Sequence, residues 1–371
     1  MDTNTTLAYK VIQEVQKAVI GKDKCIEKIM MAILSNGHIL LEDVPGVGKT
    51  TMALAFAKAL NLKENRLTFT PDVLPADLTG FTMYRKETNE FYYQPGAVMC
   101  NLFLGDEINR TSPKTQSALL EVMEEGQVSV DGATHPVPKP FIVMATQNPA
   151  GSAGTQLLPQ SQMDRFSICL QIGYPEQNEE ISILKGRLAE NTIETVQPVL
   201  NARQLIQLQK ECQNIFIHDI IYEYIVALIH ATRNHHLIEL GVSPRGTLAL
   251  TRMAQARAFL HGFHYVRPED VHSVFCDVCT HRILISSKAR ISKVSAYSIL
   301  KEILRCHFLL RLCEADIKIY KKGCFMVFNL ITFFTASSMS LSCNFISKYS
   351  CLCSVSLSFY RLDTGAYDFT V

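Results

Sequence analysis

The stretch LLEDVPGVGKTT, residues 41–52, contains most of a phosphate-binding loop and departs from it at one position. The pattern G-x-x-x-x-G-K-[ST] fits at Gly48, Lys49 and Thr50, but Asp43 replaces its first glycine. Backbone N–H groups hold the phosphates in such loops, and a short polar residue tolerates the dihedral angles of the first position. We therefore predict a working nucleotide site, with Lys49 at the β- and γ-phosphates and Thr50 at Mg²⁺.

The segments around this loop alternate between short apolar runs and helical patterns. Residues 38–43 form an apolar run before the loop, and residues 50–60 are rich in alanine and leucine, which favours a helix. Strands that alternate with helices predict an α/β fold, with a mostly parallel sheet and helices on both faces. Three further strands are expected, at 101–107, 141–149 and 166–175. A helix from Pro113 and a hairpin turn at Asp131-Gly132 are expected between the first two of these.

Polar side chains follow two of these predicted strands. Asp106 and Glu107 end the run NLFLGDE, and Asn148 ends the run FIVMATQN. The carboxyl ends of parallel strands lie beside a phosphate loop that follows another strand of the same sheet. We predict that Asp106 holds Mg²⁺ through water, that Glu107 polarises the attacking water, and that Asn148 contacts the γ-phosphate or that water.

The rest of the chain divides into two parts of different character. Strand patterns fade after Pro175, and five helical patterns follow, so we expect an α/β core over 1–175 and an all-α domain over 176–305. Residues 306–371 form an atypical tail that is rich in cysteine, serine and apolar residues. Its longest apolar run, 324–339, is shorter than the ~20 residues that span a bilayer, so a membrane span is not the favoured interpretation. The tail is either an unusual extension or sequence foreign to the parent fold.

Composition restricts the function classes. The net charge of +1 gives no long-range attraction to nucleic acid or to an acidic membrane. The amino terminus lacks the basic and apolar regions of a secretory signal, so a cytoplasmic location is expected. Cys276 and Cys279 form a C-x-x-C pair flanked by His272 and His281, which leaves a zinc site open, although buried structural thiols are the favoured interpretation.

The motifs together resemble those of the MoxR family of AAA+ ATPases. The resemblance spans about residues 5–305 and rests on six stretches. These are EDVPGVGKTT, FTPDVLPADLTGF, the run from FYYQPGAVM to MEEGQVSVDG, FIVMATQNP, LPQSQMDRF and GVSPRGTLAL. It implies an αβα nucleotide domain, a helical lid, and a homo-oligomeric ring, usually a hexamer, with ATP and Mg²⁺ at subunit boundaries. It also implies chaperone-like work on client complexes, in maturation or in metal or cofactor insertion, often with a von Willebrand factor A domain protein.

The resemblance also assigns residues. Arg165 in QMDRF is similar to the arginine finger that reaches a neighbour's γ-phosphate, and Arg245 in SPR is similar to the sensor 2 residue that links lid and nucleotide. Ile20 and Gly21 match positions that contact adenine. The expected nucleotide-binding loop comprises Pro45, Gly46, Val47, Gly48, Lys49, Thr50 and Thr51.

Besides Asp43, the sequence departs from the family pattern in two places. Gln160 stands where the family usually has an acidic residue, and the tail matches nothing typical of the family. A scaffold that binds ATP without turnover is one alternative, because a misplaced hydrophobic tail could block ring closure. A nucleic-acid motor is another, although the charge balance and the lack of a basic and aromatic stripe disfavour it.

Overall fold

The computed structural model describes residues 3–43, 46–148, 158–187 and 193–306. Residues 307–371 of the predicted tail therefore lie outside the described residues, as do Pro45 and residue 149 at the end of the predicted 141–149 strand. The described residues belong to one compact unit.

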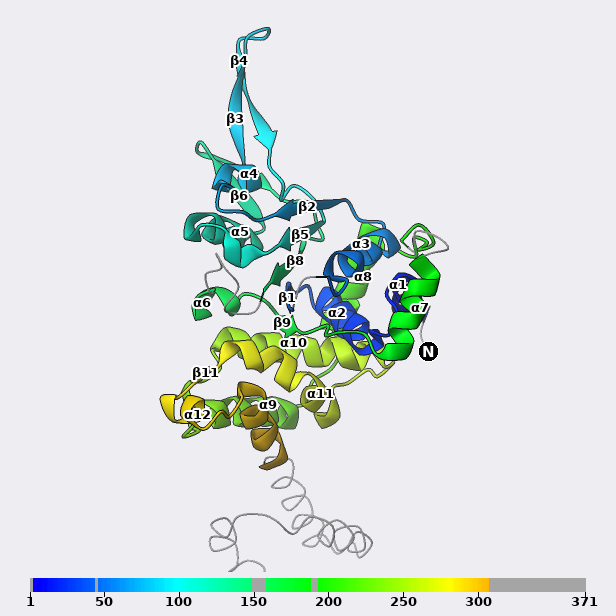
Figure 1. The fold of residues 1–371 in the computed structure, drawn as a ribbon, viewed down its shortest axis with the longest axis vertical. Coiled ribbons are helices and arrows are strands. Elements are labelled where there is room, and N and C mark those ends of the chain that lie inside the picture. Colours follow the sequence, from blue (N-terminus) through cyan, green and yellow to red (C-terminus); the bar gives the residue numbers. More distant parts are fainter. Residues whose placement is uncertain (1–2, 44–45, 149–157, 188–192, 307–371) are drawn as a thin grey trace, which may run out of the picture. The chain divides into compact units, whose positions relative to one another are not determined.

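A five-stranded parallel sheet forms the centre of this unit (Figure 1), which confirms the predicted α/β fold class. The strand order is β2-β5-β8-β1-β9, so β1 lies between β8 and β9. The register pairs Ile39 with both Met144 and Ile168, and it pairs Glu42 with Gln147, so β1 and β8 end side by side. The strands are β1 (Ile39–Glu42), β2 (Glu64–Thr68), β5 (Leu102–Asp106), β8 (Ile142–Gln147) and β9 (Ile168–Leu170).

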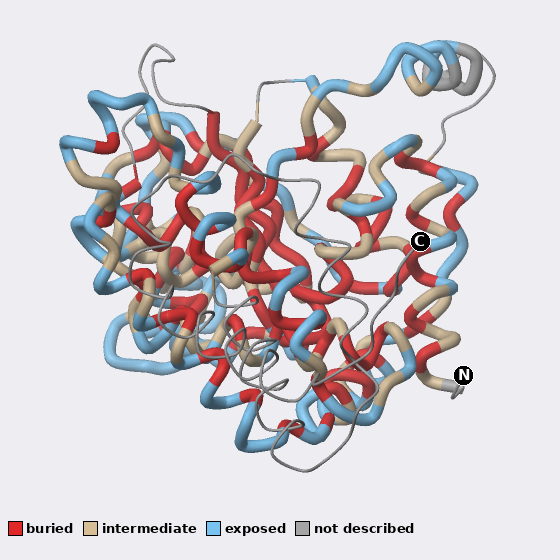
Figure 2. The backbone as a smooth tube through the Cα atoms, turned by 90° about the horizontal axis from the view of Figure 1, so that it is seen from below, coloured by how far each residue is buried: buried red, intermediate tan, exposed pale blue. Residues whose placement is uncertain are grey.

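Alternate strand residues point to two separate hydrophobic clusters, which produces the three layers of the core. Leu41, Leu104 and Met144 join a cluster that includes buried residues of α1, α2 and α3. Leu40 and Phe103 join the other cluster, which includes buried residues of α5. Figure 1 shows α3 and α5 on different sides of the strands, and Figure 2 shows the buried segments running through the middle of the described chain. The helices are α1 (Thr3–Ala18), α2 (Asp23–Leu34), α3 (Lys49–Ala59) and α5 (Pro113–Glu125).

Local sequence explains where α5 begins and ends. The Ser112 side chain accepts a hydrogen bond from the Thr115 N–H, and Pro113 occupies the first turn. Gly126 ends the helix at φ 66°. The expected hairpin follows, with β6 (Gln127–Val130) paired to β7 (Ala133–Pro136) across Asp131 and Gly132, both at positive φ.

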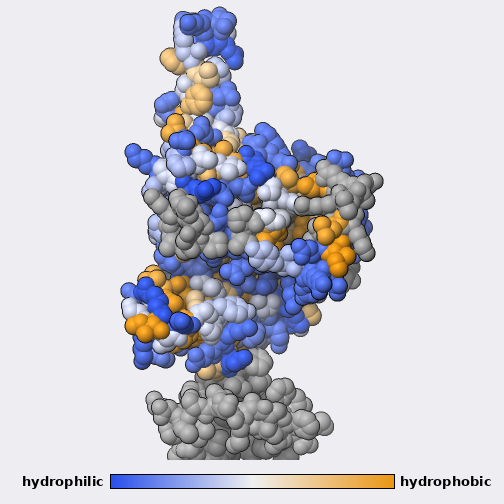
Figure 3. Space-filling view, in the orientation of Figure 1, coloured by the Kyte–Doolittle hydropathy of each residue, from blue (hydrophilic) through white to orange (hydrophobic). Residues whose placement is uncertain are grey.

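A second hairpin projects from the core at the top of Figure 1. It consists of β3 (Gly80–Arg85) and β4 (Glu90–Pro95), preceded by α4 (Pro75–Thr79). Its exposed side chains include Phe81, Tyr84 and Phe91, and Figure 3 shows apolar surface below a hydrophilic tip.

The segment after the core is mainly helical, as expected for the lid domain. Buried residues of α8, α10 and α11 belong to the same cluster as α1 to α3, so the lid packs on that face of the core. Its described elements are α7 (Gln177–Arg187), α8 (Ala202–Gln213), α9 (Asp219–Arg233), α10 (Pro244–Leu260), α11 (Pro268–Cys279), η2 (Thr280–Arg282) and α12 (Ser287–Ile291). A small antiparallel sheet, β10 (Ile238–Leu240) with β11 (Leu284–Ile285), was not predicted. Within the described residues, no helix is long and apolar enough to cross a membrane.

Candidate active site

The phosphate loop joins the carboxyl end of β1 to the amino end of α3. Gly46 and Gly48 both have φ 89°, a left-handed conformation that favours glycine, and a Cβ added at either position would meet no atom within 4 Å. The open space beside these glycines, at the start of an 11-residue helix, suits a phosphate held by backbone N–H groups. The described part of the loop therefore fits the nucleotide that the motif predicts.

Lys49 is buried at the base of this loop. Its Nζ donates to the backbone oxygen of Asp43 at 2.6 Å. Burial lowers the pKa of Lys49, although the nearby carboxylates of Asp43, Asp106 and Glu107 act in the opposite direction. The lysine therefore lies within electrostatic reach of both residues of the acidic pair.

Asp43, the residue at the mismatched position, has a structural partner. Its carboxylate accepts a hydrogen bond from the Gly173 N–H, which belongs to the segment that leads from β9 toward the lid. The substitution of the first glycine by aspartate therefore adds a link between the phosphate loop and the lid connection. The sequence predicted that the mismatch would be tolerated, but it did not predict this link.

The expected adenine residues lie beside the same connection. Lys22, next to Gly21, donates from Nζ to the Tyr174 oxygen at 2.9 Å. Gly21 has φ 73°, a left-handed conformation that favours glycine, and the Glu179 carboxylate lies in the space that a Cβ at this position would enter. Ile20 and Gly21 are thus placed along the path by which the core continues into α7.

Asp106 and Glu107 lie at the carboxyl end of β5. Asp106 is buried, and its carboxylate accepts hydrogen bonds from Arg66 Nε at 2.7 Å and from the Thr146 hydroxyl at 3.4 Å. Thr50, on the first turn of α3, supplies a hydroxyl oxygen. A carboxylate with a hydroxyl is an oxygen donor set that suits Mg²⁺.

Glu107 has an unusual backbone conformation, with φ 59° and ψ 46°. A non-glycine residue in this region is uncommon, and such strain is concentrated at functional sites. The Thr146 hydroxyl accepts a hydrogen bond from the Glu107 N–H at 2.9 Å, which holds this turn in place.

Both carboxylate oxygens of Glu107 have partners. Asn148 Nδ2 donates to one at 2.9 Å, and Arg110 Nη1 donates to the other at 2.6 Å. Partial burial acts to raise the pKa of Glu107, but the hydrogen bonds from Arg110 and Asn148 and the charges of Arg110 and Lys49 outweigh it and lower the pKa. The carboxylate is therefore ionised and oriented, as a group that accepts a proton from water must be.

Arg165 and Arg245 lie elsewhere. Both pair with Glu124 in the last turn of α5, and neither is brought together with Lys49. Arg165 precedes β9, whose first residue Ile168 is paired with Ile39 at the start of β1. The two arginines therefore lie near the amino-terminal ends of the parallel strands, whereas the loop, the acidic pair and Asn148 lie at the carboxyl-terminal ends.

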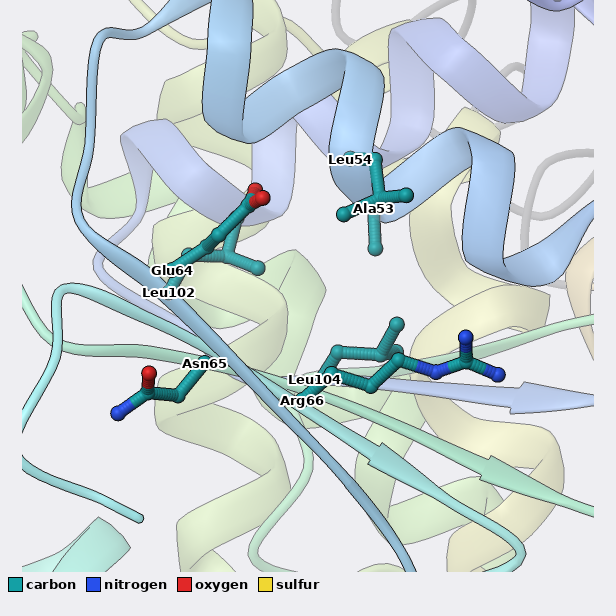
Figure 4. A pocket seen from close by; sticks show the side chains of 7 residues that line it. All are labelled: Ala53, Leu54, Glu64, Asn65, Arg66, Leu102 and Leu104. Atoms are coloured by element: carbon teal, nitrogen blue, oxygen red, sulfur yellow. The ribbon is translucent and has the colours of Figure 1, made fainter.

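Four further residues at or near the site were not predicted from the sequence. Arg66, Arg110, Thr146 and Glu124 contact predicted site residues, yet only Arg110 had a local signal, in the asparagine-arginine pair that follows Glu107. Arg66 also lines a cavity of about 190 Å³ at the edge of the sheet (Figure 4). The figure shows its guanidinium extending away from the Glu64 carboxylate at the other end of the cavity.

The C-x-x-C pair has no metal-binding surroundings in the part of the chain that the structure describes. No group of three or more His, Cys, Asp or Glu side chains suited to a metal occurs among those residues. Cys276 and Cys279 are buried free thiols, and burial raises the pKa of both, that of Cys276 to about 11. Both are protonated at neutral pH.

Comparison with known proteins agrees with this architecture. Residues 38–168 match the model of the ATPase family associated with various cellular activities (AAA), and residues 230–303 match an AAA lid domain. The chain is 38% identical to the chaperone MoxR1 of Mycobacterium tuberculosis over 80% of each protein. The chain belongs to the MoxR family of AAA+ ATPases.

Other relatives agree with this membership. The uncharacterized protein YeaC of Bacillus subtilis is 47% identical over 80% of this chain and 93% of its own length. A crystal structure of a candidate ATPase from Cytophaga hutchinsonii has a TM-score of 0.76 at 36% identity, covering 81% of this chain and 94% of the other. The resemblance inferred from the motifs is therefore confirmed, and with it the AAA+ core and lid.

Proposed function

We propose that this MoxR-family protein hydrolyses ATP in a Mg²⁺-dependent reaction. The observation that carries the proposal is the hydrogen bond from Asn148 to Glu107, within electrostatic reach of the buried Lys49. The Glu107 carboxylate, the Asn148 amide and the Lys49 ammonium group come from three separate segments and lie near one another at the carboxyl-terminal ends of the strands. That combination suits phosphoryl transfer to water.

Each residue has a role in this proposal. Lys49 and the loop N–H groups bind the phosphates, and Asn148 and Glu107 orient the attacking water, whose proton Glu107 accepts. Thr50 and Asp106 would hold Mg²⁺, which supplies charge neutralisation on the phosphates when bound. Ile20 and Gly21 contribute to the adenine pocket, together with the lid connection near Gly173.

We further propose that the active form is a homo-oligomeric ring, a hexamer by resemblance, that remodels client proteins. The β3–β4 hairpin supports this proposal, because it projects from the core and exposes Phe81, Tyr84 and Phe91. Exposed apolar side chains of this kind suit contact with a client. A von Willebrand factor A domain protein as partner, and client maturation or metal insertion as the outcome, are proposed from the family resemblance.

Nucleotide binding and turnover test the first proposal separately. Lys49→Ala should abolish ATP binding measured by calorimetry, whereas Glu107→Gln should bind ATP and lose at least 100-fold in turnover. The matched control is Lys58→Gln, a cation on the same helix whose Nζ donates to the backbone oxygens of Ile193 and Glu194. ATP binding without turnover in the wild-type protein would instead favour the scaffold function.

A further inference from the structure

One carboxylate joins the two arginines that the family motifs single out. Arg165 Nε donates to one oxygen of Glu124 at 3.0 Å, and Arg245 Nη2 donates to the other oxygen. The three side chains come from the end of α5, the segment between α6 (Gln160–Met163) and β9, and the first turn of α10. They are separated by 41 and 121 positions in sequence, so only the tertiary fold brings them together.

A second set of contacts joins the two chain segments that carry the arginines. Asp164, the neighbour of Arg165, accepts hydrogen bonds from the Ser243 hydroxyl at 2.7 Å and from Arg282 Nε at 2.8 Å. Ser243 also caps α10, whose second residue is Arg245. The Arg282 side chain is 1% exposed and is anchored further to the Ser167 oxygen. The two segments that carry the arginines are thus joined by the hydrogen bond between Ser243 and Asp164, as well as through Glu124.

This arrangement lies at the opposite end of β1 from the chain's own phosphate loop. The Ser167 N–H donates to the His38 oxygen, which places this segment at the start of β1. Asp43, which binds Lys49, follows the end of β1, and the intervening extended residues span roughly 13 Å. The side chains of Glu124, Arg165 and Arg245 are 40%, 30% and 43% exposed, so all three are accessible to another subunit.

We propose that Glu124 is a positioning residue that holds Arg165 and Arg245 side by side for the nucleotide of a second copy of this chain. The inference rests on the proposed function, because it requires ATP hydrolysis at a site shared between subunits. The inference assigns a role to Glu124, which the family motifs do not single out. It also identifies the Glu124–Arg245 ion pair as a contact between the core and the lid.

The geometry favours positioning over blocking. Arg165 is held through Nε, so its two terminal amino groups are not used in this contact, and Arg245 is held through one terminal amino group. Two cations on one carboxylate leave a net positive charge, which continues to attract a phosphate. Without Glu124 the two guanidinium groups would repel each other, and each would lose its preferred direction.

The test compares Glu124→Gln with Glu125→Gln, which removes the same charge from the next exposed residue of the same helical turn. Steady-state ATP hydrolysis is measured at a protein concentration that saturates assembly. For Glu124→Gln we expect kcat to fall about tenfold while KM for ATP stays within twofold, because the residue is remote from the phosphate loop. Glu125→Gln should match wild type, and thermal unfolding should be similar in all three proteins.

A double-variant cycle separates positioning from a general structural effect. If Glu124 acts through the arginines, adding Glu124→Gln to Arg245→Ala should lower kcat by clearly less than it does in the wild-type background. An unchanged kcat, an increase in kcat, or fully additive losses would each overturn the inference. Inactive wild type and inactive Glu125→Gln would instead contradict the proposed hydrolysis, which keeps the two failures distinguishable.

Discussion

Arg110 controls the protonation of the carboxylate that we expect to act as the base. It supplies both a hydrogen bond and a charge that lower the pKa of Glu107, against partial burial, which acts to raise it. Replacement by glutamine should therefore move the pKa of Glu107 upward. Because the base must be ionised, the acid limb of the kcat profile should shift to higher pH in Arg110→Gln.

The measurement is kcat at saturating ATP between pH 4.5 and 8, with Lys114→Gln as control. Lys114 is an exposed cation four residues further along the chain, so its loss changes net charge without removing a bond to Glu107. Coincident acid limbs for Arg110→Gln and wild type would refute the assignment of Glu107 as the base.

A second prediction at the residue scale concerns Arg66, because it forms an ion pair with Asp106, the carboxylate that we expect to bind Mg²⁺. Its Nε lies 2.7 Å from Asp106 Oδ2, and its side chain is 52% exposed. An ion pair with one solvent-exposed partner contributes about 1 kcal/mol, so release of Asp106 should lower the half-saturating Mg²⁺ concentration about two- to fivefold in Arg66→Met. Titration of ATPase activity with MgCl₂ at fixed ATP checks this, with Arg85→Met on the exposed hairpin as control. A higher Mg²⁺ requirement would show that Arg66 assists the metal site rather than competing with it.

The site residues that could be predicted from sequence are those that local motifs identify. Lys49 and Thr50 follow the glycine-rich turn, and Asp106 and Glu107 end an apolar run, so the rule for strand ends was enough to group them. Glu124 had no such signal, because its partners are 41 and 121 positions away and its own segment reads as an ordinary helix end. Contacts set by tertiary packing are not visible in the pattern of a single sequence.

At the level of elements, the strands with the clearest apolar runs are those buried on both faces. Every residue of β5 and β8 is buried, which gives the continuous apolar runs that the sequence displays. The edge strand β2 reads ENRLT and alternates between exposed and partly exposed residues, so its sequence carries no apolar signal. The strands β10 and β11 are too short for any periodicity.

His38 links three core elements and makes stability depend on pH. The Val143 N–H donates to its Nδ1 at 3.0 Å, and its Nε2 lies 3.1 Å from the Met123 oxygen at the end of α5. Since Nδ1 accepts a hydrogen bond, protonation there would break the contact with β8. Enclosure lowers the pKa of His38 to about 4, against the contribution from Met123.

The sign of the effect follows from this pKa. The unfolded chain binds a proton near pH 6.5 and the folded chain only near 4, so stability falls as pH decreases through this window. Between pH 7.5 and 5.0 the loss should be roughly 2 kcal/mol. Urea unfolding at the two pH values should show a smaller loss in His38→Gln than in wild type, whereas the exposed His230→Gln should behave as wild type. Equal losses in His38→Gln and wild type would mean that His38 titrates normally in the folded protein.

At the scale of the whole molecule, the carboxyl-terminal and amino-terminal ends of the parallel strands carry complementary halves of the proposed site. The phosphate loop, Glu107 and Asn148 lie at the carboxyl-terminal ends, and Arg165 and Arg245 lie with Glu124 near the amino-terminal ends. A contact that joins one of these halves to the other half of a second copy is heterologous, and such contacts form rings when the rotation closes. Activity per subunit should therefore rise with protein concentration.

Mixing two inactive variants tests this arrangement directly. Lys49→Ala subunits retain the arginines, and Arg165→Ala subunits retain the phosphate loop, so a mixed assembly contains some interfaces that combine both intact halves. Random equimolar mixing should place an intact loop opposite an intact arginine at about one quarter of the interfaces, because each half is intact with a probability of about one half.

ATP hydrolysis by the mixture should therefore recover a measurable fraction of the wild-type rate, although neither variant is active alone. A mixture of Lys49→Ala with Glu107→Gln provides the control, because both lesions lie on the same half and no interface regains an intact site. If Arg165 instead served its own subunit, the first mixture would be as inactive as the control, and the sharing of sites between subunits would have to be abandoned.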